Sequence, residues 1–138
     1  MRGYDRMLDF KNSENKISTR GIRGATVVNA NTAEDIEAAT VELTNEILAQ
    51  NSIDTKDIAF AIFTLTKDLN AAFPAKFARL NCGFNMVPMM CYQELDVPGS
   101  IERCLRVLFV VNTDKAQENI RHVYLKGAKI LRGDLQTK

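Results

Sequence analysis

Two short apolar runs limit what this chain can fold into. They cover Ile58–Leu65 and Val107–Val111. Both lengths suit β-strands, and neither run can cross a bilayer, which needs about 20 consecutive apolar residues. Because apolar residues occupy successive positions, each strand is apolar on both faces. The two runs therefore predict a sheet that must be covered on both sides.

One segment predicts a long helix that could cover one side of this sheet. It spans residues 29–51, where Thr32 suits an N-cap with Asp35 three residues later. Acidic side chains in the first turn favour the same helix start. The apolar residues that recur at helical spacing are Ile36, Ala39, Leu43 and Ile47.

Three further strands are expected, over residues 21–28, 86–95 and 123–131. Pro88 in the second of these argues for an edge position or a bulge, and Pro74 suits the start of a short helix. The order predicts the α+β class: a five-stranded, mostly mixed sheet with one long helix on one face. The other face then needs a cover, and a second copy of the chain is the simplest one, so we expect a homo-oligomer.

The composition predicts one globular domain in the cytoplasm. Residues 1–19 are polar and lack a period, so we expect a flexible extension before a single domain at 20–138. The net charge of +1 among 138 residues favours neither nucleic acid nor a membrane surface as a partner. The N-terminus lacks the apolar stretch of a secretory signal, and three cysteines cannot all pair, which favours a reducing compartment.

Arg106 interrupts the strand sequence CLRVLFVV. An unpaired buried charge is costly, so from the pattern alone a side chain that reaches water or pairs with a carboxylate is favoured. Arg23 lies in another strand, beside the small residues Gly24 and Ala25. Arginine binds carboxylates and phosphates through a rigid fork, and no phosphate-binding glycine loop is present. Two such arginines therefore predict a small carboxylate as the ligand.

The remaining candidates each have an ordinary structural explanation. Lys76 and Arg79 share one face of the short helix, as solvated basic residues often do. Glu94 suits a structural salt bridge, and Tyr124 suits a core or interface position. A nucleophilic pair of Cys91 with the only histidine is a disfavoured alternative.

No cluster of metal ligands and no cofactor motif is recognised, so we expect neither a metal nor a cofactor. Anion-binding groups without a nucleophile suit a binding protein. They equally suit an enzyme whose reaction forms no bond to the protein.

Five motifs, in order and in register from about residue 20 to 135, carry a family resemblance. They are RGIRGAT, AAFPAKFAR, VPMMCYQELDV, CLRV and IRHVYLKGAKILR. Together they resemble the small monofunctional chorismate mutases of the trimeric class. The resemblance implies a unimolecular Claisen rearrangement of chorismate to prephenate, a step toward phenylalanine and tyrosine. It also implies a trimer that forms a pseudo-α/β barrel with active sites at subunit interfaces.

The resemblance also implies residue roles. Arg106 would meet the ether oxygen of the substrate, Arg23 and Tyr124 would hold its side-chain carboxylate, and Glu94 with Cys91 would contact its ring hydroxyl. The other implied pocket and mouth residues are Phe73, Ala75, Lys76, Arg79, Met90, Leu131 and Arg132. Met90 departs from the pattern, because a smaller polar residue is expected there. Two alternatives remain: an imine deaminase of the reactive-intermediate type and a non-catalytic module that binds small carboxylates.

Overall fold

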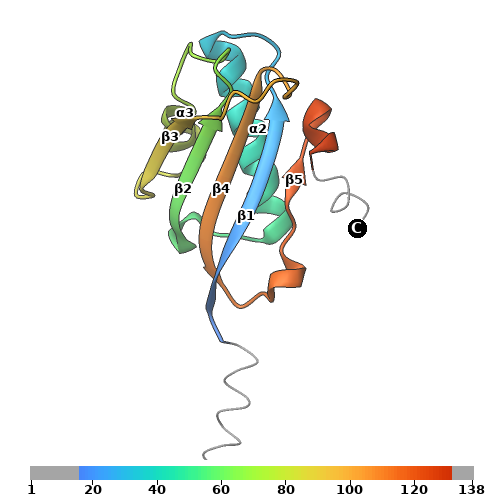
Figure 1. Ribbon diagram of the computed structural model, residues 1–138. Coiled ribbons are helices and arrows are strands. Elements are labelled where there is room, and N and C mark those ends of the chain that lie inside the picture. The colour runs from blue at the N-terminus through green and yellow to red at the C-terminus, as the bar shows by residue number, and fades with distance from the viewer. Residues whose placement is uncertain (1–15, 132–138) are drawn as a thin grey trace, which may run out of the picture.

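The computed structural model describes residues 16–131, which form a five-stranded mixed sheet with two helices of eight residues or more. The strand order is β3-β2-β4-β1-β5 (Figure 1). β4 runs antiparallel to β1 and β2, whereas β3 and β5 run parallel to their neighbours. The strands are β1 Ser18–Val27, β2 Ile58–Leu65, β3 Met89–Gln93, β4 Cys104–Thr113 and β5 Val123–Tyr124. The first strand thus begins three residues before the predicted start, and residues 1–15 of the predicted extension lie outside the described residues.

The long helix α2, Ala33–Asn51, forms as its sequence pattern predicts. The Thr32 hydroxyl accepts a hydrogen bond from the Asp35 amide at 3.0 Å, and the predicted apolar stripe is buried. The helix packs closely on β1, because a Cβ added at Gly24 would lie 2.6 Å from Ile47 Cδ1. A larger residue at position 24 would therefore force the Ile47 side chain to shift at this crossing of helix and strand.

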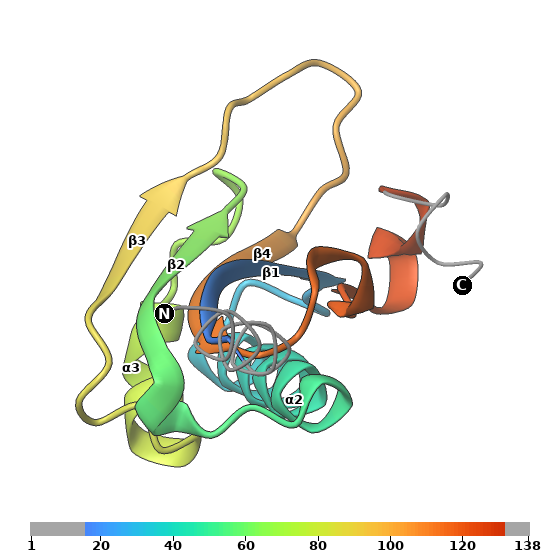
Figure 2. The ribbon, with the colours of Figure 1, turned by 90° about the horizontal axis from the view of Figure 1, so that it is seen from below.

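The shorter helix α3, Pro74–Asn81, lies on the same side of the sheet as α2 (Figure 2). It begins at Pro74, as predicted, and Gly83 follows it with φ of +78°. β3 occupies one edge of the sheet, which confirms the position inferred from Pro88. Within residues 16–131, neither helix has the length and apolar character that a membrane span needs.

The predicted last strand, residues 123–131, is wrong over most of its length. β5 contains only Val123 and Tyr124, and a 3₁₀ helix, Lys126–Ile130, follows it. Lys126 adopts φ of +53°, which turns the chain out of the extended conformation. Ala128 is then buried beside Ala25 and Tyr124 by a helical turn rather than by strand alternation.

The sheet face opposite the helices, called here the open face, carries apolar side chains. Ile62 and Leu108 are half-buried on it, and Phe60, Met90 and Tyr92 are exposed to between 41% and 59%. The described part of the chain places no helix over this face (Figure 2). An apolar sheet face of this kind is typical of a surface that another subunit covers.

Candidate active site

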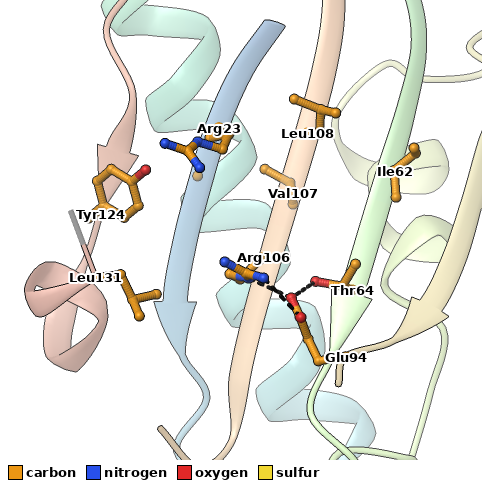
Figure 3. A pocket seen from close by; sticks show the side chains of 10 residues that line it. Arg23, Ile62, Thr64, Glu94, Arg106, Val107, Leu108, Tyr124 and Leu131 are labelled. Carbon is orange, nitrogen blue, oxygen red and sulfur yellow. Dashed lines mark hydrogen bonds and ion pairs between the residues drawn. The ribbon is translucent and has the colours of Figure 1, made fainter. Parts of the chain in front are cut away.

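A pocket of about 310 Å³ lies on the open face (Figure 3). Its floor is formed by β1, β4 and β2, and its sides come from the segment after β3 and from β5 with the turn that follows it. Five residues implicated by the sequence line it together: Arg23, Glu94, Arg106, Tyr124 and Leu131. The structure thus brings together side chains that are up to 108 positions apart in the chain, from 23 to 131.

Strand register places the two arginines in this pocket. β1 and β4 pair antiparallel with Ala25 opposite Arg106 and Arg23 opposite Leu108. Because side chains alternate between faces, Arg23 and Arg106 project from the same face of adjacent strands. Alternation along β4 therefore places Arg106 on the open face together with Leu108.

Glu94 is the partner of Arg106. Arg106 Nε lies 2.5 Å from Glu94 Oε2, and Arg106 Nη2 lies 2.9 Å from Oε1, which makes a bidentate pair. Thr64, opposite Arg106 on β2, donates its hydroxyl to the same Oε2 at 2.5 Å. The guanidinium is therefore held in one orientation on an apolar strand.

Both members of this pair stay charged at neutral pH. Hydrogen bonds from Arg106 hold the pKa of Glu94 below its usual range; burial opposes this shift and the bond from Thr64 supports it. The hydrogen bond to Glu94 raises the pKa of Arg106 above its already high ordinary value. Glu94 therefore acts only as a hydrogen-bond acceptor in the pocket.

Arg23 and Tyr124 form the other side of the pocket. The Tyr124 ring is buried, and its hydroxyl has no hydrogen-bond partner among the described residues. This hydroxyl points toward Arg23 (Figure 3), and no carboxylate within residues 16–131 forms a salt bridge with Arg23. A buried hydroxyl beside an arginine without a counter-ion suits a bound carboxylate.

Other residues implicated by the sequence lie elsewhere. Cys91 and Phe73 line a separate hollow of about 430 Å³ between β3 and the segment before α3. Cys91 pairs with Phe63 in register and packs against the main core, so it faces the helices rather than the open face. Burial raises the pKa of the Cys91 thiol, and a hydrogen bond with the Ala75 backbone partly offsets this. Within one chain, Cys91 therefore does not lie beside Glu94.

The basic residues of α3 and Met90 also lie outside the pocket. Lys76 and Arg79 are exposed on α3. Met90 is exposed at the β3 edge, where Tyr92 donates its hydroxyl to the Met90 sulfur at 3.2 Å. Arg132 lies outside the described residues.

Thr64 is a site residue that the sequence reasoning missed. It contacts Glu94 directly, although the sequence pattern shows it only as one member of an apolar run. Its signal was available, because Thr64 is the only hydrogen-bonding side chain in the β2 sequence IAFAIFTL. A lone hydroxyl on the face that also carries Arg106 could have been identified once the strands were paired.

Comparison with known proteins identifies the family to which the chain belongs. The family profile described as chorismate mutase type I matches residues 19–135. The chain belongs to the type I chorismate mutase family. It is 44% identical to chorismate mutase AroH of Bacillus subtilis (strain 168) over 116 residues, which is 84% of this chain and 91% of that protein.

Two further relatives agree. Chorismate mutase AroH of Thermus thermophilus is 47% identical over 119 residues, covering 86% of this chain and 97% of the relative. The solved structure of a chorismate mutase from Clostridium thermocellum matches with a TM-score of 0.77 and 53% identity, covering 80% of this chain and 97% of that one. The chain is thus a chorismate mutase, an isomerase, and not the deaminase or the binding module kept as alternatives.

Proposed function

We propose that the pocket on the open face binds chorismate and converts it to prephenate without a covalent bond to the protein. The observation that carries this assignment is the fixed guanidinium of Arg106. The bidentate pair with Glu94 engages two of its five N–H groups, so the others can donate to a ligand. A preorganised cation of this kind stabilises charge that develops during a reaction.

The rearrangement needs no proton transfer. One C–O ether bond breaks while one C–C bond forms within the same molecule, and electrons move around a six-membered ring. The ether oxygen gains negative charge as its bond to carbon stretches. Arg106 beside this oxygen then stabilises the transition state more than the ground state, which is the condition for raising kcat.

The remaining pocket residues hold the substrate in its reactive shape. Arg23 and the Tyr124 hydroxyl bind the side-chain carboxylate, and ionised Glu94 accepts a hydrogen bond from the ring hydroxyl. Contacts at both ends bind the folded conformer in which the reacting carbons are close, so the entropic cost of reaching this shape is met when the substrate binds. Leu131 lies over the apolar part of the substrate.

We further propose that a neighbouring subunit completes each site in a trimer. Two observations support this: the open face exposes apolar side chains, and Cys91 and Phe73 form a second hollow away from Glu94. In a closed ring of three subunits, the hollow of one chain meets the pocket of the next. Lys76 and Arg79 would then stand at the mouth and attract the dianionic substrate, and Ala75, Met90 and Arg132 would complete the surroundings.

Location stays a prediction. Cys82, Cys91 and Cys104 are all free in the structure, which agrees with the reducing cytoplasm inferred from the sequence.

Turnover and assembly are tested on the whole chain. Loss of chorismate absorbance, with prephenate identified as the product, is expected for the wild type and is expected to fall sharply in R106A. Equilibrium sedimentation at micromolar concentration is expected to give a trimer. Detection of monomer alone would overturn the assembly.

Mixed trimers test whether two chains build one site. R106A damages the pocket and K76A damages the neighbouring surface, so each alone is expected to be impaired. After co-expression, random mixing pairs an intact pocket with an intact neighbour at about a quarter of the interfaces, and activity returns in proportion. No recovery above the mean of the two parents would show that each site lies within one chain.

A further inference from the structure

The only histidine of the sequence lies beside the pocket without lining it. His122 is half-buried, and its Nδ1 accepts a hydrogen bond from the backbone amide of Arg23 at 2.9 Å. This hydrogen bond joins Arg23 and His122, which are 99 positions apart in the chain. None of the roles described above uses this contact.

The contact takes the place of a missing backbone hydrogen bond. β5 pairs with β1 only at Gly24–Val123 and Ala25–Tyr124, and Leu125 donates its amide to the Ala25 carbonyl. If β5 began two residues earlier, the parallel ladder would continue, and the Arg23 amide would donate to the Arg121 carbonyl. The imidazole of His122 supplies an acceptor where that carbonyl would stand.

Asn51 explains why the Arg121 carbonyl is elsewhere. This residue ends α2, is fully buried, and donates its side-chain amide to the Arg121 carbonyl at 2.9 Å. Its Oδ1 accepts from the Arg121 amide at 2.8 Å. The end of the helix thus holds both backbone groups of Arg121, which leaves His122 to meet β1.

We propose that His122 is a positioning residue, which sets the spacing between Arg23 and Tyr124 through its Nδ1 contact with the β1 backbone. His122 stands two residues before Tyr124 and binds the amide of Arg23 itself. It therefore joins the two strands at the point from which both carboxylate-binding side chains project. The inference rests on the proposed function of that pair.

The position of the contact predicts a specific kinetic effect. A carboxylate held by Arg23 and Tyr124 keeps its charge in the transition state, so this binding is nearly equal in both states. A less well-defined spacing between Arg23 and Tyr124 therefore raises KM and leaves kcat almost unchanged. The net worth of one hydrogen bond corresponds to a rise in KM of roughly three- to tenfold.

Two variants separate the acceptor from the ring. H122F keeps a planar ring without an acceptor, and the rise in KM is expected there with kcat within about threefold of the wild type. H122N places an amide oxygen near the position of Nδ1, and its KM is expected to return to within about twofold of the wild type. H122A is the second acceptor-free variant if H122F does not fold. Equal KM values in H122F and the wild type, or equal defects in H122N and H122F, would overturn the proposal.

A second measurement does not depend on turnover. Residue-resolved hydrogen exchange of the Arg23 amide is expected to be about tenfold faster in the acceptor-free variant than in the wild type or H122N. An unchanged exchange rate would refute the positioning contact, whatever the kinetics. Failure of R106A to lose activity would instead refute the proposed site and leave the exchange result standing.

Discussion

Replacing the charge of Arg106 while keeping its shape tests the proposed mechanism most directly. In Arg106→citrulline a carbonyl oxygen replaces one terminal nitrogen, so the side chain keeps its length and its Nε–H. It can still donate to Glu94 Oε2, which lies 2.5 Å from Nε in the wild type. The positive charge beside the substrate oxygen is lost.

The expected loss can be worked from the observed contact distance. Arg106 Nη2 stands 2.9 Å from the oxygen it now binds, and we take the same separation for the ether oxygen of the substrate. If that oxygen gains about half a charge, an effective dielectric of about 20 gives roughly 3 kcal/mol of differential stabilisation. This corresponds to a loss of about 100-fold in kcat, within the range of about 10² to 10³ for removal of one preorganised donor.

The assay follows chorismate absorbance at saturating substrate, so that kcat is measured separately from KM. Arg20→citrulline is the matched control. Arg20 lies on β1, the strand that pairs with β4, and its Nε donates to the Lys115 carbonyl at 3.0 Å outside the pocket. Its kcat is expected to stay at the wild-type value. A kcat for Arg106→citrulline within about threefold of the wild type would refute electrostatic stabilisation by this residue.

Three further changes test the Arg106–Glu94 pair and the packing of α2 on β1. T64V removes one hydrogen bond to Glu94, and kcat is expected to fall about three- to thirtyfold. Carboxyl titration by NMR is expected to place the pKa of Glu94 below 4.5 in the wild type and above 4.5 in R106A, because burial then dominates. Ionised Glu94 therefore stabilises the fold, and this contribution is fully present above pH 4.5, the ordinary pKa of a glutamate. The contribution is lost as the pH falls through the lower pKa that Glu94 has in the folded protein. G24A is expected to lower the free energy of unfolding by about 1–3 kcal/mol, measured by urea denaturation, because the new Cβ meets Ile47.

Each of these changes has its own control or contrary result. T64S keeps the hydroxyl and is expected to retain kcat, so an equal loss in both variants would rule out the hydrogen bond as the cause. A Glu94 titration that does not move in R106A would show that Arg106 does not set its pKa. G21A places a Cβ 3.4 Å from Leu108 Cδ1, and equal destabilisation by G21A and G24A would contradict the helix contact.

Local patterns determined much of this protein. The spacing of apolar residues and the Thr32 cap predicted α2, because a helix start depends on side chains within one turn. Alternation placed Arg106 on a definite face of β4, because side chains of a strand alternate regardless of its partners. Pro88 marked the edge position of β3, because proline lacks the amide that an interior strand must donate.

Only the tertiary structure decided which side chains meet. Glu94 follows β3, and its carboxylate contacts Arg106 on β4. β2 lies between these two strands and contributes Thr64, which donates a hydrogen bond to the same carboxylate. The short β5 and the His122 contact depend on where Asn51 at the end of α2 holds the chain. Such contacts span 12 to 99 positions, and they are set by strand order and register rather than by local propensity. Local sequence pattern therefore specified most of the elements and the reactive groups, whereas packing of distant segments specified the length of β5 and the site that these groups form.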